Sequence, residues 1–90
     1  MRDEIAYDPD KSAWNLEHRG FDLDCAARIF EGVVVEWDSA RQSEPRIKAA
    51  GRVEGRYLTV VYTWRGGRRR IISARPARRS ERDAYDAQTA

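Results

Sequence analysis

The sequence has almost none of the side chains from which metal, redox and disulfide sites are usually built. Its 90 residues include one cysteine, Cys25, and one histidine, His18. A single thiol excludes an intramolecular disulfide, and one thiol with one imidazole provides too few soft ligands for a zinc site. We therefore expect a cytoplasmic protein that has no metal site and uses no cofactor.

Long apolar runs are also missing. No stretch approaches the roughly 18 consecutive apolar residues that a membrane helix needs, and the first residues, MRDEIAYDPDK, lack the apolar core of a signal peptide. We expect a protein that is neither exported nor bound to a membrane. A chain of this length has room for a single domain, residues 1–90, with a small core.

Positive charge is concentrated in the second part of the chain. Residues 1–31 contain four basic and eight acidic side chains, a net charge of −4. Residues 32–90 contain thirteen basic and seven acidic side chains, a net charge of +6. This asymmetry favours a polyanion or an acidic partner, although an arginine-rich face can also simply be solvated.

Local signals predict two helices before residue 32. Asp8 is a favourable N-cap residue, a proline suits the first helical position, and Gly20 can adopt the left-handed conformation that ends a helix. The first helix is therefore expected over about Pro9 to Arg19. Asp22, followed by apolar residues at helical spacing, predicts a second helix over about Leu23 to Glu31.

Strands are predicted in the middle of the chain. The apolar run VVVEWD, residues 33–38, predicts one strand, and the turns Glu54-Gly55 and Gly66-Gly67 predict an antiparallel meander of three more. The meander strands are Arg46–Val53, Arg56–Arg65 and Arg68–Ala74. We expect an α+β fold in which two N-terminal helices and one C-terminal helix pack on a mainly antiparallel sheet.

Counting back from the two turns assigns side chains to the faces of the sheet, because side chains alternate along a strand. The predicted neighbours on the core face are Tyr62 with Ile47 and Ile71, Val60 with Ala49 and Ser73, and Leu58 with Gly51 and Arg75. The other face is predicted to be a basic platform that includes Lys48, Arg52, Arg68 and Arg70.

Three motifs follow one another along nearly the whole chain. They are Y-D-P-x-K-x-x-x-N with a basic pair and glycine after it, then A-x-x-[VI]-F, then R-I-I-S-A-R-x-A-x-x-x-E-R-x-x-Y. The matching residues are Tyr7, Asp8, Pro9, Lys11, Asn15, His18, Arg19, Gly20, Ala26, Ile29, Phe30, Arg70 to Arg75, Ala77, Glu81, Arg82 and Tyr85. In this order the motifs resemble the BrnT family of bacterial ribonuclease toxins.

The resemblance implies a RelE-like toxin fold and RNA cleavage that blocks translation. It also implies a hetero-oligomer with a cognate antitoxin that has a ribbon-helix-helix DNA-binding part. Two positions depart from the family pattern. His18-Arg19-Gly20 stands where Lys-His-Gly is usual, and Arg78 stands where a threonine commonly forms a capping box with Glu81. Ser80 is the alternative cap for the last helix.

Metal-free RNA cleavage requires proton transfer and stabilisation of charge at phosphorus. The base is expected to be His18 or a carboxylate such as Glu81. The donor to the leaving oxygen is expected to be His18, Tyr85 or no residue at all. Arg75 is the preferred phosphate ligand, because its planar fork of donors fits two phosphate oxygens. Arg19 completes the predicted catalytic set.

Further basic residues are predicted to bind the RNA backbone. They are Lys11, Lys48, Arg52, Arg68, Arg70 and Arg82. Binding needs only these cations, whereas cleavage also needs the proton-transfer groups. A small RNA- or DNA-binding module without catalytic activity is therefore the alternative function.

Overall fold

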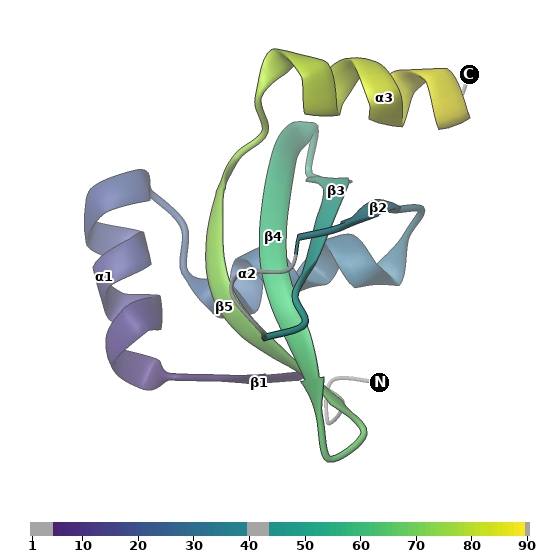
Figure 1. Ribbon diagram of the computed structural model, residues 1–90. Coiled ribbons are helices and arrows are strands. Elements are labelled where there is room, and N and C mark those ends of the chain that lie inside the picture. The colour runs from purple at the N-terminus through teal and green to yellow at the C-terminus, as the bar shows by residue number, and fades with distance from the viewer. Residues whose placement is uncertain (1–4, 40–43, 90) are drawn as a thin grey trace.

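The computed structural model describes residues 5–39 and 44–89, which form three helices, a short 3-10 segment and a five-stranded mixed sheet (Figure 1). The elements are β1 (Ile5–Tyr7), α1 (Pro9–Arg19), α2 (Leu23–Ala26), η2 (Ala27–Glu31), β2 (Val35–Asp38), β3 (Ile47–Val53), β4 (Arg56–Arg65), β5 (Arg68–Pro76) and α3 (Arg79–Thr89). None of the helices in the described ranges is long and apolar enough to span a membrane.

The sheet has the strand order β1-β5-β4-β3-β2. Strands β2 to β5 pair antiparallel with their neighbours, but β1 joins β5 in parallel. The sheet is therefore mixed, and the prediction of a mainly antiparallel sheet is wrong. The α+β class itself is confirmed. Strand β1 was not predicted, because three residues are too few to show a strand pattern.

Helix α1 begins and ends where its capping residues predict. The side chain of Asp8 accepts a hydrogen bond of 2.9 Å from the backbone N–H of Asp10. Gly20 adopts a left-handed conformation with φ of 85° and donates its N–H to the carbonyl of Leu16. These two caps set the bounds of α1, which lies beside the outer edge of β5 (Figure 1).

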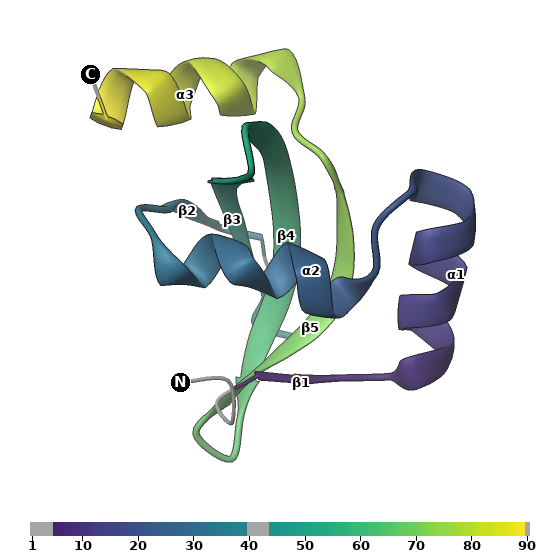
Figure 2. The same cartoon turned by 180° about the vertical axis from the view of Figure 1, so that it is seen from behind.

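The core lies between one face of the sheet and the α2–η2 segment, which crosses that face (Figure 2). The buried apolar residues of this cluster are Phe21, Leu23, Ala26, Ile29, Ala49, Val53, Leu58, Val60, Tyr62, Ile71 and Ala74. Gly51 permits the close approach, because a Cβ atom there would lie 2.8 Å from Cβ of Ile29. Helix α3 instead runs across the end of the sheet (Figure 1).

A β-bulge in β5 changes the predicted faces. The pairs formed with β3 are confirmed, as is the pair Tyr62–Ile71, but beyond it the predicted register is wrong. The observed pairs are Val61 with Ser73, Val60 with Ala74, Thr59 with Arg75 and Leu58 with Pro76. Ile72 is thus an extra residue without a partner, as in other bulges. As a result Arg75 lies opposite Thr59, on the face away from the core, and not opposite Leu58.

Candidate functional site

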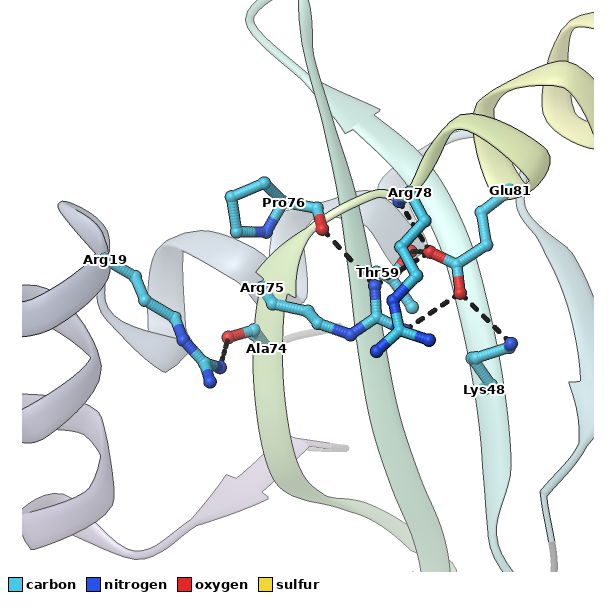
Figure 3. A network of polar contacts seen from close by, with 8 residues as sticks. All are labelled: Arg19, Lys48, Thr59, Ala74, Arg75, Pro76, Arg78 and Glu81. Atoms are coloured by element: carbon cyan, nitrogen blue, oxygen red, sulfur yellow. Dashed lines mark hydrogen bonds and ion pairs between the residues drawn. The ribbon is translucent and has the colours of Figure 1, made fainter.

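A buried carboxylate at the start of α3 is surrounded by hydrogen-bond donors (Figure 3). Glu81 is only 3% exposed, and its two oxygens each accept a hydrogen bond of 2.8 Å from the guanidinium of Arg75. Thr59 Oγ1 and the backbone N–H of Arg78 donate to Oε1 at 2.8 Å. Lys48 Nζ lies 3.0 Å from Oε2. The buried negative charge is therefore fully compensated.

Two local features of the sequence bring this network together. Helix α3 begins at Arg79, so Glu81 lies in the first turn and reaches back to the N–H of residue 78. This is half of a capping box, and it forms although residue 78 is arginine. Ser80 is already inside the helix and does not cap it. The bulge in β5 then places Arg75 on the side of the sheet where Glu81 lies.

The network controls the charge state of Glu81. The hydrogen bonds from Arg75 above all, followed by those from the Arg78 N–H, Lys48 and Thr59, hold the pKa of Glu81 far below its ordinary value, in spite of burial. The same contact raises the pKa of Arg75. A carboxylate with five donors and a lowered pKa is a poor proton acceptor at neutral pH. This geometry favours Glu81 as the residue that orients Arg75.

We expect acid to weaken the fold through Glu81. Its pKa is lower in the folded chain than its ordinary value of 4.5, so its stabilisation is complete above that pH and is lost as the pH falls toward the folded pKa. The melting temperature, followed by circular dichroism, should therefore decrease below about pH 4.5. The decrease should be shallower in Glu81→Gln, which cannot titrate. An equally steep decrease in that variant would contradict the assignment.

A second cluster lies at the C-terminal end of α1, beside β5. The imidazole of His18 stacks on the indole of Trp14 with ring centroids 4.3 Å apart, and Nδ1 lies 2.9 Å from the Trp14 carbonyl oxygen. Because a carbonyl only accepts, Nδ1 carries a proton and Nε2 of the neutral ring can accept one. The guanidinium of Arg19 lies 5.2 Å from the centroid of the same indole and donates to the carbonyl of Ala74.

A pocket of about 220 Å³ separates α1 from β5. Its walls are formed by Lys11, Trp14, Asn15, Arg19, Leu23, Ile72 and Ser73. Asn15 is buried and donates from Nδ2 to the carbonyl of Phe21 at 2.8 Å, which ties α1 to the segment that follows it. The exposed side chain of Lys11 lies at the opening of the pocket, so the predicted RNA ligand and Arg19 share one cavity.

Three other predicted site residues gather around Tyr57, on the platform face. Arg52 and Arg82 lie 4.8 Å and 6.0 Å from the centroid of its ring, and the ring of Tyr85 meets it edge-on at 6.0 Å. The Tyr57 hydroxyl donates to Asp86 at 2.9 Å. Tyr57 was not predicted as a site residue, although strand alternation already placed it on the same face as Arg52.

The remaining predicted ligands lie at the other end of β5. Arg68 pairs with Arg65 and Arg70 with Thr63 near the β4–β5 turn, away from Glu81 and from α1. The structure therefore joins Arg75, Glu81 and Lys48 in one network. It groups His18 and Arg19 around Trp14, and Lys11 shares only the pocket wall with Arg19. The network and the Trp14 cluster adjoin, because Arg19 binds the carbonyl of the residue just before Arg75 (Figure 3).

No group of three or more histidine, cysteine, aspartate or glutamate side chains that could hold a metal ion occurs in the described ranges. Comparison with known protein families matches residues 7–81 to the model of the ribonuclease toxin BrnT of type II toxin–antitoxin systems. No curated protein matches the chain. The match spans 75 of the 90 residues and contains both adjoining clusters. The chain therefore belongs to the BrnT family of ribonuclease toxins.

Proposed function

We propose that this protein is a metal-independent endoribonuclease that blocks translation in the cytoplasm. In this reaction the ribose 2′-oxygen bonds to phosphorus, the bond to the 5′-oxygen breaks, a base takes the 2′-hydroxyl proton and a proton goes to the leaving oxygen. The observation that carries the proposal is the junction at Ala74, where Arg19 on α1 meets the strand just before Arg75. The cations Arg19 and Arg75 are thus brought to one end of β5, and His18 precedes Arg19 on α1.

Arg75 is proposed to stabilise the charge that develops at phosphorus. Glu81 occupies the Nη1 and Nη2 end of the guanidinium, and Nη1 also donates to the carbonyl of Pro76 at 3.3 Å. The remaining side, with Nε–H and one N–H of Nη2, makes no hydrogen bond to any described residue. Two parallel N–H groups fit two phosphate oxygens. Glu81 is then the positioning residue that fixes this side in place.

His18 is proposed to transfer the proton. Its Nε2 is the ring nitrogen left available once Nδ1 donates to the Trp14 carbonyl. Arg19 adds positive charge beside it, and Tyr85 on α3 is the alternative donor to the leaving oxygen. The RNA backbone would bind along Lys11, Lys48, Arg52, Arg68, Arg70 and Arg82. Lys48 has a double role, since it also pairs with Glu81.

The partner that restrains this activity is proposed to be a cognate antitoxin with a ribbon-helix-helix DNA-binding part, bound in a hetero-oligomer. The +6 charge of residues 32–90 supports a partner with acidic segments, because opposite charges accelerate association. We expect the antitoxin to cover Arg70 and Arg75 on the sheet or the neighbouring α3. A partner bound to α1 and α2 alone would contradict this.

Induced expression of the protein alone should arrest bacterial growth and deplete intact RNA, and co-expression of the antitoxin should relieve both. His18→Gln should permit growth at equal soluble expression, because glutamine cannot transfer the proton. Normal growth with soluble wild-type protein would favour the alternative, a binding module without catalysis.

The purified protein should cleave RNA equally well in EDTA, since the proposed chemistry uses only side chains. Activity that EDTA removes and a divalent ion restores would disprove the metal-independent reaction.

A further inference from the structure

The pocket between α1 and β5 has the composition of a nucleobase site. The indole of Trp14, which His18 stacks on one face, and the guanidinium of Arg19 line it, and Leu23 and Ile72 add apolar walls. Unpaired bases in RNA are bound by such aromatic and guanidinium planes. We propose that this pocket binds one unpaired nucleobase of the RNA, next to the bond that is cut. The inference rests on the proposed function, because it assigns a base subsite to the same RNA.

The bulge and the short β1 strand leave backbone groups of β5 turned toward this pocket. Strand β1 pairs with β5 only as far as Tyr7–Ile71, so beyond Ile71 no strand among residues 5–39 and 44–89 covers that edge. The carbonyl of Ala74 points to α1, where it accepts a hydrogen bond from Arg19. In an antiparallel strand the N–H of a residue points the same way as its carbonyl. The Ala74 N–H is therefore expected to point to α1 as well, where it can donate to a ligand.

Side chains of the pocket supply the complementary groups. Nδ2 of Asn15 donates to the Phe21 carbonyl, which leaves Oδ1 of this lining residue as an acceptor. The Ser73 hydroxyl, also in the pocket wall, can donate or accept. A donor, an acceptor and a hydroxyl along one cavity suit the polar edge of a base, which specific RNA-binding proteins read by hydrogen bonds.

The size and charge of the pocket suit one base with its attached phosphate at the cations. Its volume of about 220 Å³ lies below the roughly 300–1,000 Å³ of pockets for drug-sized ligands. Lys11 stands at the opening and forms no ion pair with a described residue, so it can bind the phosphate attached to the base. Arg19 is the second basic residue of the wall. Inorganic phosphate would bind to these two cations. It would not contact Trp14, Asn15 or Ser73, which are proposed to contact the base.

The test is an NMR titration of the full-length ¹⁵N-labelled protein with each of the four nucleoside 3′-monophosphates and with inorganic phosphate. We expect the Trp14 indole N–H and the Ala74 amide N–H to shift with nucleotides, most strongly with one base, and not with phosphate. Equal shifts with phosphate would show an anion site only. Nucleotide shifts that leave both groups unmoved would place binding elsewhere. Either result overturns the proposal.

Two variants and a control extend the test to affinity. Trp14→Ala should weaken nucleotide binding about 5- to 150-fold, the usual loss for one stacked base. Trp64→Ala is the matched control, because Trp64 is equally exposed, 51% against 48%, but lies at the far end of β4. Ser73→Ala keeps the packing and should change the preference among the four nucleotides. The proposed subsite would be contradicted if Trp14→Ala bound nucleotides with unchanged affinity and Ser73→Ala kept the wild-type preference among the four nucleotides.

These results separate the subsite from the proposed reaction. If the nucleotides bind at Trp14 and Ala74 but RNA is not cleaved, the subsite stands and the ribonuclease proposal fails. If the protein cleaves RNA while Trp14→Ala and Ser73→Ala retain the wild-type sequence preference, the ribonuclease proposal stands and the subsite fails.

Discussion

Replacing Arg75 with alanine should slow the cleavage of bound RNA about a hundredfold or more, equivalent to about 2–4 kcal/mol of barrier. The free side of the guanidinium is proposed to meet the phosphate oxygens as charge develops on them, so its loss acts mainly on the transition state. RNA affinity should change much less. Single-turnover cleavage at saturating protein measures the rate, and a separate titration measures the affinity.

The matched control is Arg52→Ala, which removes the same charge from a residue that packs on Tyr57. It should weaken RNA binding and lower the salt dependence by about one phosphate contact, with little effect on the chemical step. Lys48 is unsuitable as a control because it also pairs with Glu81. A wild-type cleavage rate in Arg75→Ala would mean that the arginines of β5 serve binding alone.

Glu81→Ala should be the most destabilising substitution at the site, by about 3–5 kcal/mol, because it leaves Arg75 and Lys48 partly buried without their common anion. In a chain of this size each kcal/mol lowers the melting temperature by about 4–8 °C. Thermal unfolding followed by circular dichroism measures the loss.

Asp83→Ala provides the comparison on the same helix. Asp83 is exposed and its contact with Arg79 is 4.0 Å long, so removing it should change stability by less than about 1 kcal/mol. Similar melting temperatures for Glu81→Ala and Asp83→Ala would show that the buried network contributes little to stability. Arg75 would then have to be held in place by other contacts.

The parts of the fold that local signals determine could be predicted from the sequence. The bounds of α1 depend on Asp8 and Gly20, which act within one turn of the helix, and both were identified. The β3–β4 pairs follow from a two-residue turn and from period-two alternation, which nothing interrupts. The same alternation placed Lys48 and Thr59 together on the platform face.

Features that depend on distant contacts could not be predicted. Strand β1 exists because residues 5–7 meet residues 69–71, far along the chain, and a three-residue stretch has no pattern of its own. The extra residue at Ile72 leaves no local signal either, because isoleucine suits any position in a strand. As a result Arg75, which the sequence analysis selects as a candidate, was assigned to the wrong face.

The bulge makes the length of β5 as important to the site as its composition. Deleting Ile72 should leave a regular strand in which Ser73, Ala74 and Arg75 keep their partners on β4, because the deleted residue is the one that has none. Inserting one more residue beside Ile72, if no wider bulge took it up, would instead exchange the faces of every strand residue after it. Arg75 would then point to the side where Ala74 now lies opposite Val60, and Glu81 would lose its partner although neither residue had been substituted. A single-codon insertion here therefore differs in kind from a point mutation, because it changes where unaltered side chains point.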